Sequence, residues 1–287
     1  MMLDKAVVYI HVGDRYAVPL AVSIATLRRH CDAPVVIMTD VDSGYDSALK
    51  IAADSRLGHI YVMANWVAVK CAAKVAEDEL AIYLLKVEIS RCLTSEYSLM
   101  LDSDTVIMGD ISELWPKQPG EVVLTHRYGG ARQNLKVRKR CGKWSKIVPK
   151  LTRRMGRKVL PQPTPINTGV MAFGPDTMPF RDAWLNLASV NPIHSCDEQA
   201  AQLIAPDFNC RIADRIYNGC PRFDRDNPDV RIFHGVGKKF WIKPYGRAIW
   251  YPLFAEVASQ NLGNILELLP SMAWAGKNAV KELEEMI

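Results

Sequence analysis

Short apolar runs alternate with helix-like segments along the first half of the chain. Four runs have the length of a strand: residues 6–12, 35–38, 60–63 and 97–101. Two segments between them have apolar residues at helical spacing: residues 19–30 and 79–93. Strands that alternate with helices predict βαβ units. We therefore expect an α/β fold with a mostly parallel central sheet flanked by helices.

The second half continues with shorter elements and ends in a helical tail. Further strands are predicted at 121–124, 169–173 and 232–234, and further helices at 178–190 and after Asp197. From about Phe254 the apolar residues have helical spacing, with an interruption near Pro270. We expect one domain over residues 1–253 with an insertion at about 127–160, and a helical tail over residues 254–287 packed on that domain.

One predicted strand stops at two carboxylates. Residues 97–101 lead into Asp102-Ser103-Asp104, and another apolar run follows. In an open α/β sheet, ligands gather at the carboxyl ends of the strands. Two carboxylates at this spacing can share one divalent cation, and such a cation can bridge a diphosphate. A plain turn or helix cap also fits an acid-x-acid pattern, so both interpretations stay open at this point.

Three later segments add polar groups of the kind that such a site uses. Asn167 and Gly169 stand at the mouth of a predicted strand, and Asp197-Glu198-Gln199 stands at a predicted helix start. Residues 234–239 combine an imidazole, two glycines and two lysines. An imidazole can complete a carboxylate metal site, glycines let the backbone approach phosphate, and lysines supply positive charge.

Taken in this order, the segments resemble the GT-A-fold glycosyltransferases, in particular the retaining family 8, which includes glycogenin and bacterial lipopolysaccharide galactosyltransferases. Residues 102–115 resemble the acid-x-acid signature of that family and its continuation, and residues 167–171 resemble its asparagine–glycine strand. The resemblance extends from about residue 6 to 245. It implies a GT-A (Rossmann-like) fold and a metal-dependent transfer of sugar from a nucleotide sugar, a UDP-sugar, to a hydroxyl acceptor with retention.

The resemblance also implies roles for individual residues. Asp102, Asp104 and His234 would hold Mn²⁺ or Mg²⁺ against the diphosphate of the donor. The residues that would contact the nucleotide or its phosphates are Asp14, Tyr16, Lys86, Ser103, Gly237, Lys238 and Lys239. Those that would face the donor sugar or its anomeric carbon are Asn167, Asp197, Glu198 and Gln199.

The chain departs from the family pattern at several places, among them Gly13 and Lys86, where relatives often have an acid and an arginine, and two of the departures leave alternative residues open. Phe240 stands where the family usually has proline, and the loop before it is one residue shorter, so Lys238 and Lys239 are alternatives for the phosphate contact. Glu198 falls where relatives often carry glutamine, and a shift of one residue would bring Gln199 there. Ordinary structural roles stay open as well: turn residues at the first strand, a helix cap at Asp197 and a core histidine at position 234.

The charge of the chain is concentrated in the insertion. Residues 127–158 hold thirteen Lys or Arg, and no Asp or Glu occurs from 122 to 175. The whole chain has a net charge of +5, so the rest of it stands at −8. This contrast predicts an anionic acceptor. Three alternatives remain: DNA with a hydroxylated base, a phosphorylated or lipid-linked glycan, and a solvated loop without an acceptor role.

Composition narrows the remaining classes of protein. The chain is 49% hydrophobic and 23% charged, as in an ordinary globular protein, and it has no apolar run of about 18 residues. Seven cysteines without CxxC spacing favour reduced thiols, although Cys210 and Cys220 are within pairing range in the sequence. We expect a cytoplasmic location, with the inner membrane surface as an alternative. A nucleotide-sugar-binding protein without transferase activity and a nucleotidyltransferase are the competing functions.

Overall fold

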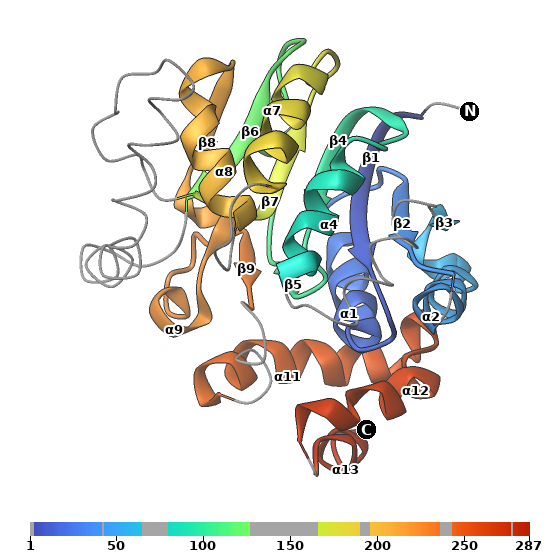
Figure 1. Cartoon of the computed structure of the whole chain (residues 1–287). Coiled ribbons are helices and arrows are strands. Elements are labelled where there is room, and N and C mark those ends of the chain that lie inside the picture. The colour runs from blue at the N-terminus through green and yellow to red at the C-terminus, as the bar shows by residue number, and fades with distance from the viewer. Residues whose placement is uncertain are drawn as a thin grey trace.

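A computed structural model describes residues 3–41, 43–64, 80–126, 166–189, 196–235, 243–276 and 278–287. The basic segment predicted at 127–158 lies outside these residues, as do Gly237, Lys238 and Lys239. A seven-stranded sheet forms the centre of the fold (Figure 1). Its strands, in spatial order, are β3 (Ile60–Ala64), β2 (Val35–Thr39), β1 (Leu3–His11), β4 (Ser95–Leu101), β7 (Ile166–Phe173), β6 (Val122–His126) and β8 (Cys210–Ala213).

The sheet is mostly parallel, as predicted, and β7 is the strand that runs against its neighbours. β7 pairs antiparallel with both β4 and β6, whereas the other neighbouring pairs are parallel. The start of β7 therefore lies beside the carboxyl ends of β4 and β6. The Asp102 N–H donates to the Gly169 carbonyl over 2.8 Å, so the amide and glycine of β7 stand next to the acid-x-acid loop.

A second, two-stranded sheet is formed by β5 (Thr105–Ile107) and β9 (Ile232–His234). The two strands are antiparallel, and Thr105 lies opposite His234. The Gly235 N–H also donates to the Asp104 carbonyl over 2.7 Å. This small sheet is what joins the acid loop to the histidine segment, which is far away in the sequence.

The strands of the main sheet are apolar on both faces, and helices cover both. Val7 and Tyr9 point to one face, where they pack with α1, α2, α11 and α12; Ala6 and Val8 point to the other, where α4 packs. The helices α7 and α8 cover that second face over β6 and β7. The helix bounds are α1 (Ala17–Leu27), α2 (Ser43–Ala52), α4 (Leu80–Ser90), α7 (Met178–Ser189), α8 (Cys196–Ile204), α9 (Pro221–Asp224), α11 (Pro244–Ser259), α12 (Ile265–Leu268) and α13 (Ala279–Glu284).

Short 3₁₀ turns complete the described elements. They are η1 (Ser55–Leu57), η2 (Ser112–Leu114), η3 (Ala205–Asp207), η4 (Arg215–Asn218), η5 (Leu262–Asn264) and η6 (Leu269–Ala275). Among the described helices and strands, α2, β5, β8 and α9 have no counterpart in the sequence prediction. β5, β8 and α9 have only three or four residues, which is too short for a recognisable pattern. Half of the ten residues of α2 are apolar, but Gly44 in its first turn weakens the helix signal.

The helical tail begins earlier than predicted. α11 starts at Pro244, so the predicted boundary between residues 253 and 254 falls inside a helix. Pro244 stands in the first turn of α11, where its missing N–H costs no hydrogen bond. Figure 1 shows α11 and α12 beside α1, and their apolar side chains share the core cluster of that helix.

Two further observations concern the cysteines and the helices of the described residues. Cys210 and Cys220 both have free thiols, so the pairing that the sequence left open does not form. Among the described helices, none combines the length and the apolar character that crossing a bilayer requires.

Candidate active site

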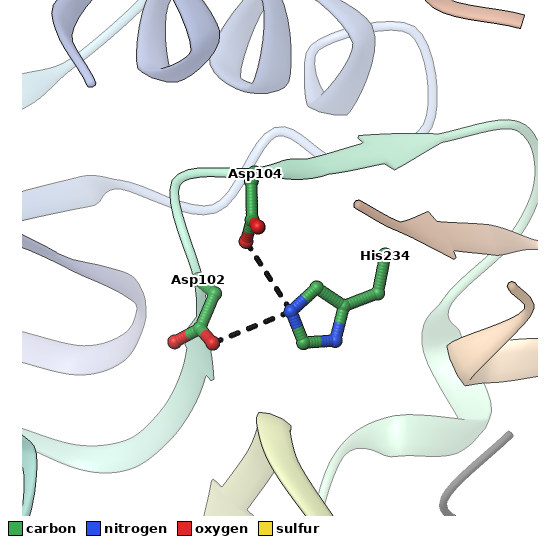
Figure 2. Close-up of side chains that lie close together, drawn as sticks. All are labelled: Asp102, Asp104 and His234. Carbon is green, nitrogen blue, oxygen red and sulfur yellow. Dashed lines mark ion pairs between the residues drawn. The ribbon is translucent and has the colours of Figure 1, made fainter. Parts of the chain in front are cut away.

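Two carboxylates and an imidazole converge at the carboxyl edge of the main sheet (Figure 2). Asp102 and Asp104 come from the loop between β4 and β5, and His234 is the last residue of β9. The His234 Nε2 lies 3.4 Å from Asp102 Oδ2 and 3.2 Å from Asp104 Oδ1. The acid loop leads directly into β5, and His234 ends β9. The pairing of these two strands therefore brings the three side chains together.

These three residues fit a divalent cation. One ligand atom from each lies within 4.8 Å of the other two. Neighbouring ligands in an octahedral Mg²⁺ site lie about 3 Å apart, given metal–oxygen distances of about 2.1 Å. The two distances from Nε2 are close to that value. Carboxylate oxygen with one imidazole is also a donor set that Mg²⁺ and Mn²⁺ accept.

His234 is buried and its approach depends on a glycine. A Cβ at Gly169 would overlap the imidazole ring, so any other residue there would push His234 away. Burial alone would lower the pKa of His234, but the negative charges of Asp104 and Asp102 raise it to about 10. In the absence of a metal, the imidazolium is therefore the cation that holds the two carboxylates together.

Lys86, on α4, is a second cation at the same site and is mostly shielded from solvent. Its Nζ lies 2.6 Å from Asp102 Oδ1 and 4.0 Å from Asp197 Oδ2, and its side chain is 14% exposed. Burial would lower the pKa of Lys86, but the two carboxylates outweigh it and raise that pKa above its usual range. Burial would raise the pKa of Asp102, but Lys86 and His234 hold it well below its ordinary value. Asp102 is therefore ionised at neutral pH.

The acids of α8 meet the start of β7. Asn167 Nδ2 donates to Glu198 Oε1 over 2.6 Å, and the Thr168 hydroxyl donates to Asp197 Oδ2 over 2.5 Å. Asp197 is buried, and burial raises its pKa despite the nearby Lys86. Within the described chain, Asp197 Oδ1 has no hydrogen-bond partner. A buried acceptor of this kind can receive a hydrogen bond from a water or from a ligand.

The structure distinguishes Glu198 from Gln199 by one contact. Both residues lie in the first turn of α8, and Glu198 is the one bonded to Asn167. Gln199 is partly exposed. The Trp184 indole N–H donates to the Asp197 carbonyl over 2.8 Å and so fixes the start of α8 against α7.

The loop after β1 lies at the same edge. Asp14 is exposed just before α1, and the ring of Tyr16 lies 5.4 Å from that of Trp274. Burial, together with the charges of Asp104 and Asp102, raises the pKa of Tyr16 to about 12. The Ser103 hydroxyl donates to the Ile10 carbonyl over 3.3 Å, which holds the acid loop against β1. Tyr16 is therefore close enough to Asp102 and Asp104 for their charges to disfavour its ionised form.

Three residues near the site were not predicted: Thr168, Asn218 and Trp274. Thr168 stands between Asn167 and Gly169, so its proximity to a predicted residue was the only available signal. Asn218 bonds to both His234 and Asn167, and Trp274 reaches the β1 loop from the tail through a hydrogen bond to the Arg15 carbonyl. Neither has a local motif that would reveal these contacts.

The strand order, the reversed β7 and the site at the carboxyl edge define a GT-A fold. No protein-family model matches the chain, and no curated protein sequence matches it. The comparison with solved structures does give matches, several of which are glycosyltransferases. The resemblance predicted from the sequence is thus confirmed at the level of the fold.

Three of these structures illustrate the match. The galactosyltransferase LgtC, solved with donor and acceptor sugar analogues, has a TM-score of 0.61 and 16% identity over 89% of this chain and 95% of LgtC. The bifunctional glycosyltransferase WbbM has a TM-score of 0.60 and 14% identity over 93% of this chain and 51% of WbbM. GlyE of Streptococcus pneumoniae has a TM-score of 0.54 and 15% identity over 91% of this chain and 64% of GlyE.

Proposed function

We propose that this chain is a glycosyltransferase that uses Mn²⁺ or Mg²⁺ to move a sugar from a nucleotide sugar to an acceptor hydroxyl. The observation that carries the proposal is the convergence of Asp102, Asp104 and His234 at the carboxyl edge of a GT-A sheet. The resemblance to the family 8 glycosyltransferases favours a UDP-sugar as donor, and no single residue selects uracil by its chemistry.

The residues around the metal site have distinct tasks in this proposal. A bound divalent cation would neutralise charge on the departing nucleoside diphosphate. Lys86 keeps the ligand carboxylate of Asp102 ionised and also contacts Asp197, so one ammonium ties the metal side of the site to the sugar side. The backbone of the loop that carries Asp102 and Asp104 is held by the bonds of the Ser103 hydroxyl to Ile10 and of the Asp102 N–H to Gly169.

The residues of β7 and α8 face the donor sugar in this proposal. Asp197 Oδ1, which is buried, would accept a sugar hydroxyl, and Asn167 holds Glu198 in place. Glu198 would stabilise the positive charge that develops at C1 as the bond to the diphosphate oxygen breaks with its electron pair. The acceptor oxygen then attacks C1 from the face that the diphosphate leaves, its proton passes to a phosphate oxygen, and configuration is retained.

We propose an anionic acceptor. The support is the charge of residues 127–158, where thirteen cations occur without a carboxylate. DNA with a hydroxylated base would bind with a steep salt dependence, whereas a phosphorylated or lipid-linked glycan would draw the chain to an anionic membrane surface. Mobility of a short duplex at low salt and sedimentation with anionic vesicles separate these two acceptors.

The experiment that tests the function is release of nucleoside diphosphate from a panel of nucleotide sugars with MnCl₂. Donor hydrolysis does not require the acceptor, so a transferase releases diphosphate from at least one donor, and EDTA stops the release. A protein that binds a nucleotide sugar without releasing diphosphate is a binding protein. Release of pyrophosphate from a nucleoside triphosphate would instead indicate a nucleotidyltransferase. Either of these results contradicts the proposal.

A further inference from the structure

Asn218 lies between the metal side and the sugar side of the site. It is the last residue of η4 and is fully buried. Its Oδ1 lies 3.1 Å from His234 Nδ1, and its Nδ2 lies 2.9 Å from Asn167 Oδ1 and 2.8 Å from Thr125 Oγ1. All three partners are buried as well. One amide therefore connects the imidazole to the residue that holds Glu198.

The orientation of this amide follows from a backbone donor. The Gly169 N–H donates to the side chain of Asn167 over 2.9 Å, and a backbone N–H can only donate, so the atom that it meets is Asn167 Oδ1. The group of Asn218 that faces this oxygen must then be its NH₂. The Asn218 oxygen is consequently the atom that faces His234.

The same reasoning fixes the hydrogen on the imidazole. An amide oxygen only accepts, so His234 Nδ1 must carry the proton in that hydrogen bond. In a neutral imidazole, Nε2 then has its lone pair free, and Nε2 is the atom that lies 3.2 Å from Asp104 and 3.4 Å from Asp102. A lone pair at this position is what a metal ligand requires.

We propose that Asn218 is a positioning residue: its amide fixes His234 in the tautomer, and the ring orientation, in which Nε2 binds a divalent cation. The inference rests on the metal site of the proposed function. Without an acceptor at Nδ1, the neutral ring would populate the other tautomer, whose N–H at Nε2 excludes a metal. An amide performs this task without adding charge to a region that already holds the carboxylates of Asp102, Asp104 and Asp197.

The test is the Mn²⁺ affinity of the full chain, measured by calorimetry with MnCl₂ and no donor. Asn218→Leu removes the acceptor at similar volume, and we expect a loss of about 10- to 100-fold in affinity. Asn218→Asp keeps an oxygen acceptor for His234 Nδ1 while losing the donors to Thr125 and Asn167, and we expect it to bind at least as tightly as the wild type. Thr125→Val removes one partner of the same amide, and we expect a change of less than about twofold, because Asn167 still orients Asn218.

Each outcome bears on a different claim. If Asn218→Leu binds Mn²⁺ as tightly as the wild type, the role of Asn218 is overturned and the metal site stands. The same holds if the Asp and Leu variants lose Mn²⁺ affinity equally. A wild-type protein that binds no Mn²⁺ overturns the metal site and the inference with it. If Asn218→Leu does not fold, ¹⁵N NMR of the wild-type protein saturated with Mg²⁺ decides: we expect the proton of His234 on Nδ1, and a proton on Nε2 contradicts the inference.

Discussion

Two strands of this protein end on a buried histidine, and the two strand ends differ in charge. His11 ends β1 and His234 ends β9, with exposed fractions of 1% and 4%. The pKa of His11 is lowered to about 4, whereas that of His234 is raised to about 10. Burial is nearly equal in the two places, so burial does not determine which histidine is charged.

The neighbours of each ring explain the difference. His11 Nε2 bonds to the Ser47 hydroxyl over 2.7 Å, and burial lowers its pKa without an opposing charge. At His234, burial has the same direction, but two carboxylates outweigh it. The end of β1 is therefore a neutral part of the core, and the end of β9 is an ionic site. What makes the difference is the pairing of β5 with β9, which brings Asp102 and Asp104 to the second ring.

The largest effect is expected when one of the two carboxylates beside His234 is removed. Asp102→Asn removes the charge that pairs with Lys86 and His234, so we expect donor hydrolysis to fall by at least about 1,000-fold, the equivalent of several kcal/mol of lost charge stabilisation. The pKa of His234 should fall below about 10, while the remaining charge of Asp104 still raises it. Diphosphate release and NMR titration measure the two changes.

The matched control is Asp110→Asn, which changes an exposed carboxylate that follows β5 and bonds to Ser112. We expect its activity and its histidine titration to equal those of the wild type. Equal losses in the two variants would show that the effect of Asp102→Asn is not specific to the site.

A smaller effect is expected when the second cation is removed. Lys86→Met leaves Asp102 and Asp197 without their ammonium, and breaking a buried pair in this way costs about 3–5 kcal/mol of unfolding free energy in the absence of metal. MnCl₂ should restore part of this loss, since a cation again faces the carboxylates. Urea unfolding with and without MnCl₂ measures both. The control is Lys117→Met, which removes an exposed ion pair with Glu113 and should lower the free energy of unfolding by less than about 1 kcal/mol. A similar loss in both variants would contradict the larger contribution of the Lys86 pair.

The pH dependence of metal binding tests the raised pKa of His234. Below pH 10 the metal-free ring is protonated, so each Mn²⁺ that binds Nε2 displaces one proton. We therefore expect the affinity to rise about tenfold per pH unit from pH 6 to 8.5. Calorimetry in buffers of different ionisation enthalpy counts the released proton. An affinity that does not change with pH would mean that His234 is already neutral, like His11.

The smallest effect concerns His11 and the stability of the protein in acid. Because the folded pKa of about 4 lies below the ordinary 6.5, the unfolded state takes up the proton first, and stability falls as the pH falls below 6.5. At pH 5 this costs about 2 kcal/mol. His11→Gln cannot be protonated, so from pH 7 to pH 5 it should lose about 2 kcal/mol less than the wild type in urea unfolding. Equal losses would contradict a neutral His11.

For His234 the sign is opposite: its stabilisation of the metal-free protein is complete below pH 6.5 and is lost as the pH rises through 10.

The sequence predicted the parts of this site that depend on local pattern. The main strands are apolar runs, and the acids follow one of them directly, so the carboxyl edge and the residues Asp102 and Asp104 could be identified. The role of Lys86 could not be derived in this way, because a lysine on a helix shows no sign of being buried until its two carboxylate partners are known.

The contacts that escaped prediction all depend on distant pairing. β9 was predicted at 232–234, but β5 has three residues and was not, so the pairing of the two strands that creates the metal site could not be predicted. Asn218 stands in a segment that resembles an ordinary turn, and its bonds to His234 and Asn167 exist only after η4 has packed against β7 and β9. The direction of β7, which brings Asn167 to the carboxyl edge, likewise follows from pairing with β4 and β6.

The most direct test of the central claim is a crystal structure with MnCl₂ and UDP, read from the anomalous signal of manganese. We predict one manganese peak at about 2.1 Å from carboxylate oxygens of Asp102 and Asp104 and from His234 Nε2, with the diphosphate on its open side. Manganese bound to UDP without these three residues, or a peak elsewhere on the chain, would contradict the account.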